Sequence, residues 1–203
     1  MRTPVARVRM IAVLMFSLHI TSTVVFADPL EDGQAAYNRG DYATALNLLR
    51  PLAEQGDASA QNSLGWMYDQ GHGVTQDFKE ATKWYRSAAE QGLREAQYNL
   101  GVIYFQGRGT PSNFREALKW YRKAATQGDA QAQYNLGFMY VNGVGVPKDL
   151  SRGHMWWDLA SKNGEGAAWG NLDALTKIMT KEQIARAREM EQKCETSKYA
   201  QCD

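Results

Sequence analysis

The chain repeats itself at an interval of 36 residues, and this period constrains its fold more than any other feature. Three segments, Ala60–Val74, Ala96–Thr110 and Ala132–Val146, align without gaps. The recurring positions include Leu64, Leu100 and Leu136, then Gly65, Gly101 and Gly137, then Tyr68, Tyr104 and Tyr140. A fixed period of this length is typical of stacked supersecondary units that bury one shared core.

The first half of each repeat predicts an amphipathic helix. In the first copy Ala60, Leu64 and Tyr68 are spaced by four residues, so they share one helical face. Gly65 falls in the middle of this helix, where glycine costs about 1 kcal/mol relative to alanine. Its return in every copy indicates that another helix approaches too closely to admit a side chain. Gly-x-Gly loops at residues 71–73, 107–109 and 143–145 then end the helix.

The second half of each repeat predicts a second helix, antiparallel to the first. Asp77, Asn113 and Asp149 are good N-cap residues at its start. Glu80 and Glu116 follow the first two by three residues, which resembles a capping box. We expect the recurring rings of this helix to lie in the core: Trp84, Tyr85, Trp120, Tyr121, Trp156 and Trp157.

The ends of the array differ from its centre and predict capping elements. Upstream, Ala43–Gly56 matches the second helix of a repeat, with a shorter partner near Gln34–Arg39. Downstream, Ala167–Thr176 begins a degenerate copy, and Lys181–Lys193 predicts a charged amphipathic helix. Solenoids need such polar elements to close their apolar ends. The sequence therefore predicts an all-α solenoid of eight to ten helices, with no strand pattern after residue 27. Its expected segments are 1–27, 28–57, 58–93, 94–129, 130–165 and 166–203.

Residues 1–27 have the pattern of a secretory signal peptide. Basic residues precede an apolar run, Met10–Ile20, and Val25 and Ala27 stand at the −3 and −1 positions of a cleavage site. The run is too short for a comfortable membrane span, which needs about 20 apolar residues. We therefore expect a bacterial protein exported to the periplasm or secreted, without stable membrane insertion after cleavage. An uncleaved signal anchor is the alternative.

Charge and cysteine content agree with an exported globular chain. Without residues 1–27, 20 basic and 22 acidic side chains remain, so no global attraction to nucleic acid or anionic lipid is expected. The two cysteines, Cys194 and Cys202, could form a disulfide in an oxidising compartment. Two reduced thiols are the alternative.

The repeat pattern A-x-x-x-L-G-x-x-Y, followed by G-x-G and then by A-x-x-W-Y-x-x-A-A-x-x-G, resembles the Sel1-like repeat, a relative of the tetratricopeptide repeat. The resemblance is close over Ala58–Gly164 and looser over Asp32–Lys193. It implies a right-handed α/α superhelix that serves as an adaptor for other proteins, with no chemistry common to the family. This inference is an analogy from fold.

The resemblance also suggests which surface binds. In tetratricopeptide-like solenoids the first helices line the concave face, so side chains opposite Ala60, Leu64 and Tyr68 should point toward a ligand. Aromatic anchors among amides suit an extended or helical peptide of a partner protein. Two alternatives are that these rings only pack first helices together, or that Trp66, Tyr98 and Tyr134 stack on an envelope glycan such as peptidoglycan. The candidate residues are Asn62, Trp66, Gln70, Tyr98, Val102, Phe105, Gln106, Tyr134, Phe138 and Asn142.

The usual catalytic patterns are missing from the sequence. It contains no HExxH, no GxSxG and no Ser-x-x-Lys, and its Gly-x-Gly loops follow helices rather than strands. His72 occupies a variable loop position, and His154 lies on a second helix. Cysteine-rich members of the Sel1-like repeat family are described as β-lactamases. They carry a cysteine pair in each repeat, which is absent here. We therefore expect no catalytic residue, metal site or cofactor, with a hydrolase as the least favoured alternative.

Overall fold

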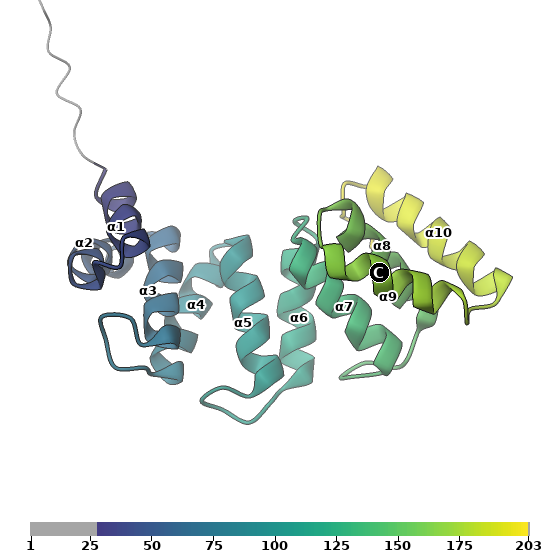
Figure 1. Ribbon diagram of the computed structural model, residues 1–203, viewed down its shortest axis with the longest axis horizontal. Coiled ribbons are helices and arrows are strands. Elements are labelled where there is room, and N and C mark those ends of the chain that lie inside the picture. The colour runs from purple at the N-terminus through teal and green to yellow at the C-terminus, as the bar shows by residue number, and fades with distance from the viewer. Residues whose placement is uncertain (1–27, 203) are drawn as a thin grey trace, which may run out of the picture.

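Ten α-helices follow one another along residues 28–202, the part of the chain that the computed structural model describes, and this part contains no strand (Figure 1). The predicted signal peptide lies outside the described residues. The all-α prediction is confirmed for residues 28–202. The helices are α1 (Pro29–Asn38), α2 (Tyr42–Glu54), α3 (Ala58–Gln70), α4 (Phe78–Glu90), α5 (Arg94–Gln106), α6 (Phe114–Ala125), α7 (Ala130–Asn142), α8 (Leu150–Lys162), α9 (Gly166–Thr176) and α10 (Lys181–Thr196).

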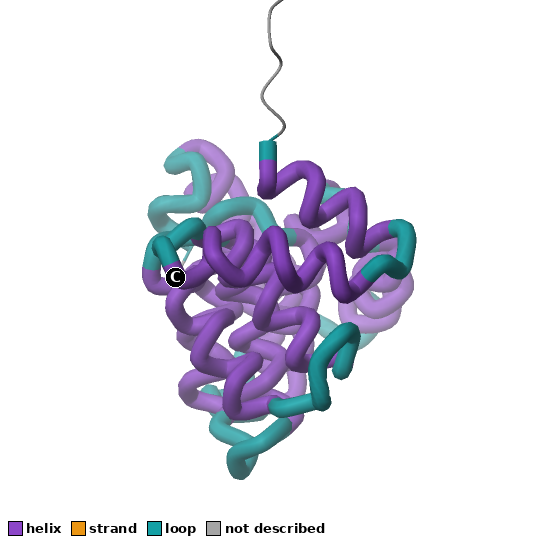
Figure 2. The backbone as a smooth tube through the Cα atoms, turned by 90° about the vertical axis from the view of Figure 1, so that its left-hand side faces the viewer, coloured by secondary structure: helices purple, strands orange, loops and turns teal. Residues whose placement is uncertain are grey.

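The helices form a solenoid in which consecutive helices pack together. Each helix from α1 to α8 packs against the next along the chain, whereas α10 packs against α8. The view along the array shows the helices stacked behind one another, with loops at the edges (Figure 2). None of the helices in residues 28–202 combines the length and the apolar character needed to cross a membrane.

A glycine in the middle of each first helix lets a ring of the second helix touch its backbone. A Cβ atom on Gly65 would lie 2.8 Å from Cδ1 of Tyr85, and one on Gly101 would lie 2.5 Å from Cδ1 of Tyr121. In the third full repeat, the ring of Trp157 occupies the same place against Gly137. Real Cβ atoms do not come this close to other atoms, so the close approach predicted from the sequence is confirmed.

The second glycine of each Gly-x-Gly loop connects one repeat to the repeat before it. Gly109 has φ +70°, and a Cβ there would lie 2.7 Å from Cβ of Phe78 on the preceding second helix. Gly145 repeats the contact with Phe114. Only glycine combines the left-handed backbone with this proximity. The loop therefore joins two repeats in addition to reversing the chain.

The N-caps form as predicted, but the capping boxes do not. Asp77 and Asn113 each accept a backbone N–H at the start of their helices. The two glutamates have other partners: Glu80 forms an ion pair with Lys83, and Glu116 accepts a hydrogen bond from Nε1–H of Trp120 at 3.2 Å. The sequence resemblance to a capping box was therefore wrong for these two helices. A reciprocal capping box occurs instead at the start of α10.

Buried glutamines link successive helix pairs through a ladder of hydrogen bonds that the 36-residue period alone does not predict. Gln97 is 4% exposed and donates to the carbonyl of Ala89 at 3.1 Å. Its own side-chain oxygen accepts from Gln127 at 2.8 Å. Because a buried amide without a partner is costly, each rung favours one register between neighbouring repeats. Gln61 with Gln91, and Gln133 with Asn163, form the equivalent rungs.

Five of the six rings expected in the core are buried, and Trp84 is only half-buried. The equivalent Trp120 is 4% exposed because Lys123 lies over its ring, with Nζ 4.7 Å from the centroid. The residue three positions after Trp84 is Ser87, whose short side chain cannot cover an indole. Trp84 still packs against the N-terminal core cluster, so the core prediction is met in full by five rings and in part by Trp84.

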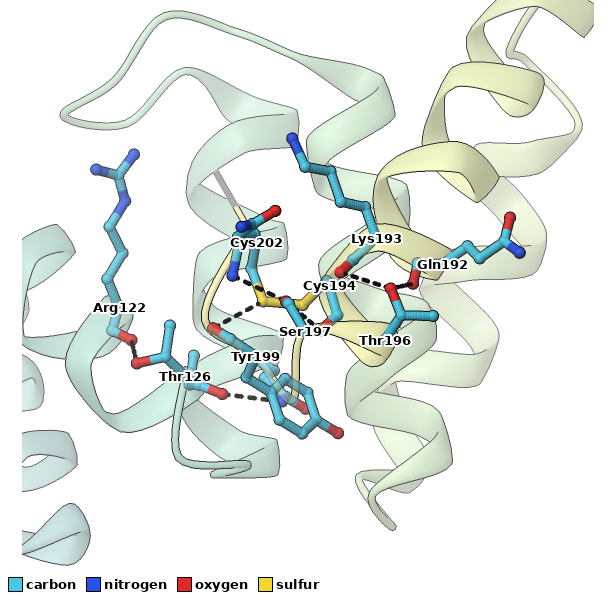
Figure 3. Close-up of a disulfide and its surroundings, with 12 residues drawn as sticks. Arg122, Thr126, Gln192, Lys193, Cys194, Thr196, Ser197, Tyr199 and Cys202 are labelled. Carbon is cyan, nitrogen blue, oxygen red and sulfur yellow. Dashed lines mark hydrogen bonds between the residues drawn. A yellow bond between two sulfur atoms is a disulfide. The ribbon is translucent and has the colours of Figure 1, made fainter.

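The C-terminal helix and a disulfide close the end of the solenoid. Cys194 and Cys202 are bridged, and both cysteines belong to the main buried core (Figure 3). Within the short loop that the bridge closes, Tyr199 accepts a hydrogen bond from Asn163 at 3.0 Å. Since Asn163 also donates to Gln133, the tail continues the amide ladder beyond the last regular repeat.

A carboxylate pair holds α10 against α8. Glu191 is 8% exposed, hydrogen-bonds Asp158 and contacts Lys162, which also reaches Glu195 at 3.0 Å. Burial, reinforced by the hydrogen bond to Asp158, raises the pKa of Glu191 to about 7. Burial alone would also raise the pKa of Asp158, but Glu191 and Lys162 hold it below its usual range. The two carboxyl groups therefore share one proton below pH about 7.

This geometry predicts how the stability of the α10 contact depends on pH. The pKa of Glu191 is higher in the folded state than its ordinary value of 4.5. Its contribution to the free energy of unfolding is therefore complete below pH 4.5 and is lost as the pH rises through about 7. Glu191→Gln keeps a donor for Asp158 without the charge. Since one pKa unit corresponds to about 1.4 kcal/mol, the rise from 4.5 to about 7 corresponds to about 3.4 kcal/mol at most, and we expect this variant to be more stable than wild type by about 1–3 kcal/mol at pH 8. At pH 5 the difference should be close to zero, as measured by urea unfolding. Glu189→Gln, an exposed change on the same helix, is the control, and an equal difference at both pH values would contradict the account.

The glycine–ring contact predicts opposite effects for two glycine substitutions. Gly101→Ala should lower the free energy of unfolding by about 2 kcal/mol, because the new methyl group overlaps the ring of Tyr121. Gly170→Ala on α9 meets nothing within 4 Å and should raise it by up to about 1 kcal/mol through helix propensity. Urea unfolding followed by circular dichroism measures both. Equal effects of the two changes would show that the central glycines are not required for packing.

Candidate functional site

Two neighbouring hollows lie on the face formed by the first helices, and we call them together the first-helix groove. The amide hollow has a volume of about 230 Å³ and lies between α1 and α3. The acidic hollow has a volume of about 610 Å³ and lies between α3, α5 and the start of α7. Trp66 lines both hollows. The amide hollow is lined by Gln34, Tyr37, Asn38, Leu49, Asn62, Ser63 and Trp66, and the acidic hollow by Trp66, Asp69, Gln70, Glu95, Tyr98, Asn99, Val102, Ile103, Arg108, Asp129 and Gln131.

Trp66 is exposed yet held in a fixed orientation. Trp66 is 41% exposed, and its Nε1–H donates a hydrogen bond to the hydroxyl of Tyr37 at 2.6 Å. The Tyr37 hydroxyl lies 2.7 Å from Nδ1 of His72, whose ring stacks on Tyr42 with centroids 4.4 Å apart. Because Tyr37 accepts from Trp66, its own proton is available to His72. Fixing the indole in this way lowers the entropy that a bound partner must remove.

The amide hollow is uncharged. Its polar lining consists of three carboxamides, the hydroxyls of Ser63 and Tyr37, and the edge of Trp66. Asn62 accepts a hydrogen bond from Asn99 of the next repeat at 3.1 Å, which links the amide hollow to the acidic one. A lining of this kind both donates and accepts hydrogen bonds without discriminating by charge.

The acidic hollow carries more negative than positive charge. Nη1 of Arg108 lies 3.1 Å from both carboxylate oxygens of Asp69, so this pair is internally neutral. Glu95 and Asp129 remain, and Arg94 contacts them from outside the hollow at 2.8 and 3.9 Å. Burial raises the pKa of Asp129, and the Glu95 charge adds to that rise. Burial also opposes ionisation of Glu95, but backbone and Arg94 hydrogen bonds hold its pKa below the usual range.

The structure brings half of the candidate binding residues into the groove. Asn62 lines the amide hollow, Trp66 lines both hollows, and Gln70, Tyr98 and Val102 line the acidic hollow. Asn62 and Asn99 are partners, as are Tyr98 and Asn135, so amide contacts run between neighbouring first helices.

The other five candidates do not line either hollow. Phe105 packs edge-on against Phe114 and Phe138, with centroids 5.4 and 6.1 Å apart. Tyr134 stacks on Trp157 and accepts a hydrogen bond from Asn171 on α9. The side chain of Asn142 donates to the carbonyl of Phe138, which is 39% exposed, and Gln106 is exposed on the same face.

Of the groove residues that are absent from the candidate list, four set the hydrogen bonding and charge of the groove: Tyr37, Glu95, Asp129 and Arg108. Tyr37 lies in the irregular N-terminal copy, where the repeat gives no alignment. Glu95 and Asp129 stand at helix starts, where a charge is ordinarily explained by capping. Arg108 occupies the variable position between two glycines, and its partner Asp69 aligns with Phe105 and Val141. The available signal was that opposite charges, Asp69 and Arg108, stand at positions where the other copies have no acidic or arginine residue.

Side chains of the types that ligate metals are dispersed over the described part of the chain. Within residues 28–202, no three histidine, cysteine, aspartate or glutamate side chains are grouped to hold a metal ion. His72 pairs with Tyr37, and His154 lies 3.1 Å from the hydroxyl of Thr176 on the other end of the molecule.

Stability measurements separate the exposed rings from the packed rings. Tyr134→Ala should lower the free energy of unfolding by about 2 kcal/mol, because it removes the contact with Trp157 and leaves Asn171 unpaired. Trp66→Ala should cost about 1 kcal/mol or less, since the ring is largely exposed and loses one hydrogen bond. Trp169→Ala, at a residue 67% exposed, is the control. Urea unfolding that gives Trp66→Ala the larger cost would contradict this division.

The sequence and the fold both match known proteins. The family model described as Sel1 repeat matches residues 30–57, 58–93, 94–129 and 130–165. A Sel1 repeat protein of Oxalobacter formigenes is 32% identical, with a TM-score of 0.73 over 82% of this chain and 70% of that one. A protective antigen present in uropathogenic Escherichia coli strains, which displays an SLR fold, is 30% identical with a TM-score of 0.71. That match covers 84% of this chain but only 42% of the antigen. No curated protein matches the chain.

Proposed function

This chain belongs to the Sel1 repeat family, and we propose that it is an exported scaffold that binds a segment of another protein in its first-helix groove. Sel1 repeats commonly serve as protein-interaction scaffolds and generally have no catalytic role. The partner would be an extended polypeptide.

The fixed exposed indole of Trp66 between two hollows is the observation that carries this proposal. An aromatic side chain that is held by a hydrogen bond and still 41% exposed is a good anchor for a partner. Asn62 and Asn99 lie beside it, and their carboxamides can bond the N–H and C=O groups of an extended backbone. The rigid register of the repeats keeps these groups in place, which reduces the entropy lost on binding.

Export is proposed from the sequence of residues 1–27 and is supported by the disulfide. A Cys194–Cys202 bridge persists in oxidising compartments and is rare in the cytosol. The expected location is the bacterial periplasm or the outside of the cell.

A cell-envelope glycan is a second candidate ligand, favoured by the amide hollow alone. A sugar ring could stack on Trp66 while Gln34, Asn38 and Asn62 bond its hydroxyls. Cosedimentation with purified cell-wall sacculi tests this candidate. Retention of the wild type, together with loss of retention by Trp66→Ala, would favour the glycan over a polypeptide.

The peptide-binding proposal predicts that capture of a partner depends on the groove. The purified protein should retain a protein from the envelope fraction of its native host after crosslinking, and Trp66→Ala with Gln70→Ala should reduce the yield at least tenfold. The reason is that truncating a central anchor typically costs 2 kcal/mol or more, which is about a factor of 30.

The matched control is Trp169→Ala on α9, which removes an exposed tryptophan far along the array. It should leave the yield unchanged, and circular dichroism should show that all variants stay helical. Equal capture by the groove variant and wild type would exclude the groove as the binding surface.

Export and oxidation predict the mass of the protein recovered from the periplasm or medium. Intact-mass spectrometry should find a chain that begins at Asp28 and lacks two hydrogen atoms, which correspond to the Cys194–Cys202 bridge. A chain that retains Met1 in the membrane fraction would support a signal anchor instead. Alkylation of both cysteines without prior reduction would contradict the bridge.

A further inference from the structure

Trp66 separates two hollows of unlike charge, and this asymmetry restricts what an occupant can present. The amide hollow has no ionisable side chain other than the hydroxyl of Tyr37. The acidic hollow is lined by three carboxylates and one guanidinium, and that guanidinium is already paired with Asp69. A polypeptide that crosses Trp66 therefore meets a neutral surface on one side and a negative surface on the other.

The negative charge of the acidic hollow is only partly compensated. Arg94 offsets Glu95, but it is 45% exposed and reaches Asp129 only at 3.9 Å. The Asp129 side chain is 14% exposed, and one of its carboxylate oxygens accepts a hydrogen bond from the backbone N–H of Ala132. Glu95 and Asp129 therefore repel each other in a partly desolvated place, where a third cation would be attracted more strongly than in open water.

The remaining walls of the acidic hollow suit a cation on a long apolar stem. Trp66 and Tyr98 present ring surface, and Val102 and Ile103 present methyl groups. Aromatic faces attract guanidinium and ammonium groups, and the methylene stem of arginine or lysine can lie along apolar surface. The volume of about 610 Å³ exceeds what one such side chain needs.

We propose that the acidic hollow receives an arginine or lysine side chain of the bound polypeptide, while an uncharged side chain occupies the amide hollow. The inference rests on the proposed function and adds the chemistry of the partner: a segment with a basic residue next to a neutral one. Glu95 and Asp129 supply the opposite charge, and Trp66 with Tyr98 supplies the surface for the stem.

Nuclear magnetic resonance titration of the purified protein with N-acetyl-arginine methylamide tests this proposal. The signal of the Trp66 Nε1–H and the backbone amides of Glu95 and Asp129 should shift. The citrulline analogue has nearly the same shape without the charge and should cause no comparable shift. Raising the salt concentration should weaken the arginine effect.

Two neutral substitutions remove the charge without removing the helix cap. Glu95→Gln with Asp129→Asn keeps an N-cap on α7, since asparagine caps as well as aspartate. We expect affinity for the arginine probe to fall about fivefold, because exposed charge pairs contribute up to about 1 kcal/mol. Asp57→Asn is the matched control: it neutralises the N-cap of α3, outside the acidic hollow, and should leave affinity unchanged.

The outcomes distinguish this inference from the proposed function. Three results would overturn the proposal that a basic side chain occupies the acidic hollow. These are equal shifts with the citrulline analogue, shifts confined to other surfaces, and unchanged affinity in the double variant. If partner capture still depends on Trp66 in that case, the groove binds polypeptides of other chemistry. If capture does not depend on Trp66, the proposed function fails whatever the arginine probe does.

Discussion

The contact between a central glycine of each first helix and a ring of its partner helix is the constraint on which the rest of the structure depends. Gly65, Gly101 and Gly137 bring the two helices of each full repeat together through a bare backbone. The next glycine-dependent contact, between a Gly-x-Gly loop and the preceding second helix, sets one repeat upon another. Both contacts use glycine because no side chain fits, and together they determine which face of each first helix remains uncovered.

That uncovered face forms the groove, and the side chains that differ between the repeats determine its shape and charge. Trp66 stands where the next two copies have Val102 and Phe138, so the regular array supplies the place and a departure from the repeat supplies the anchor. The Asp69–Arg108 pair is a second departure, and it forms the wall between two neighbouring repeats. Toward the C-terminus the same face is filled by ring-on-ring packing and by α9. The two hollows of the groove thus lie over the first repeats, whereas Tyr134 in the last full repeat is packed against Trp157 and α9.

Periodicity predicted the helices, their glycine boundaries and the close approach at Gly65, because these features recur in register and depend on local sequence. It failed to predict side-chain contacts that join residues about 30 to 40 positions apart. The Asp69–Arg108 pair needs the superhelical register, which no single repeat specifies. Gln97 and Gln127 recur in register within one repeat, but the period alone does not show that their amides meet. Trp84 shows the same limit, because its exposure depends on the replacement of one covering lysine by Ser87. The candidate binding residues that line the groove all come from the first two copies, because Tyr134 of the third copy is packed against Trp157 and α9.

Site-specific photocrosslinking in the native host tests the central claim most directly. A benzophenone amino acid would replace Gln70, which lines the groove, or Lys83, which is also exposed but lies on the second helix α4. The account predicts a discrete crosslinked adduct from position 70 and none from position 83. Adducts from position 83 alone, or of equal yield from both positions, would contradict a binding surface on the first helices.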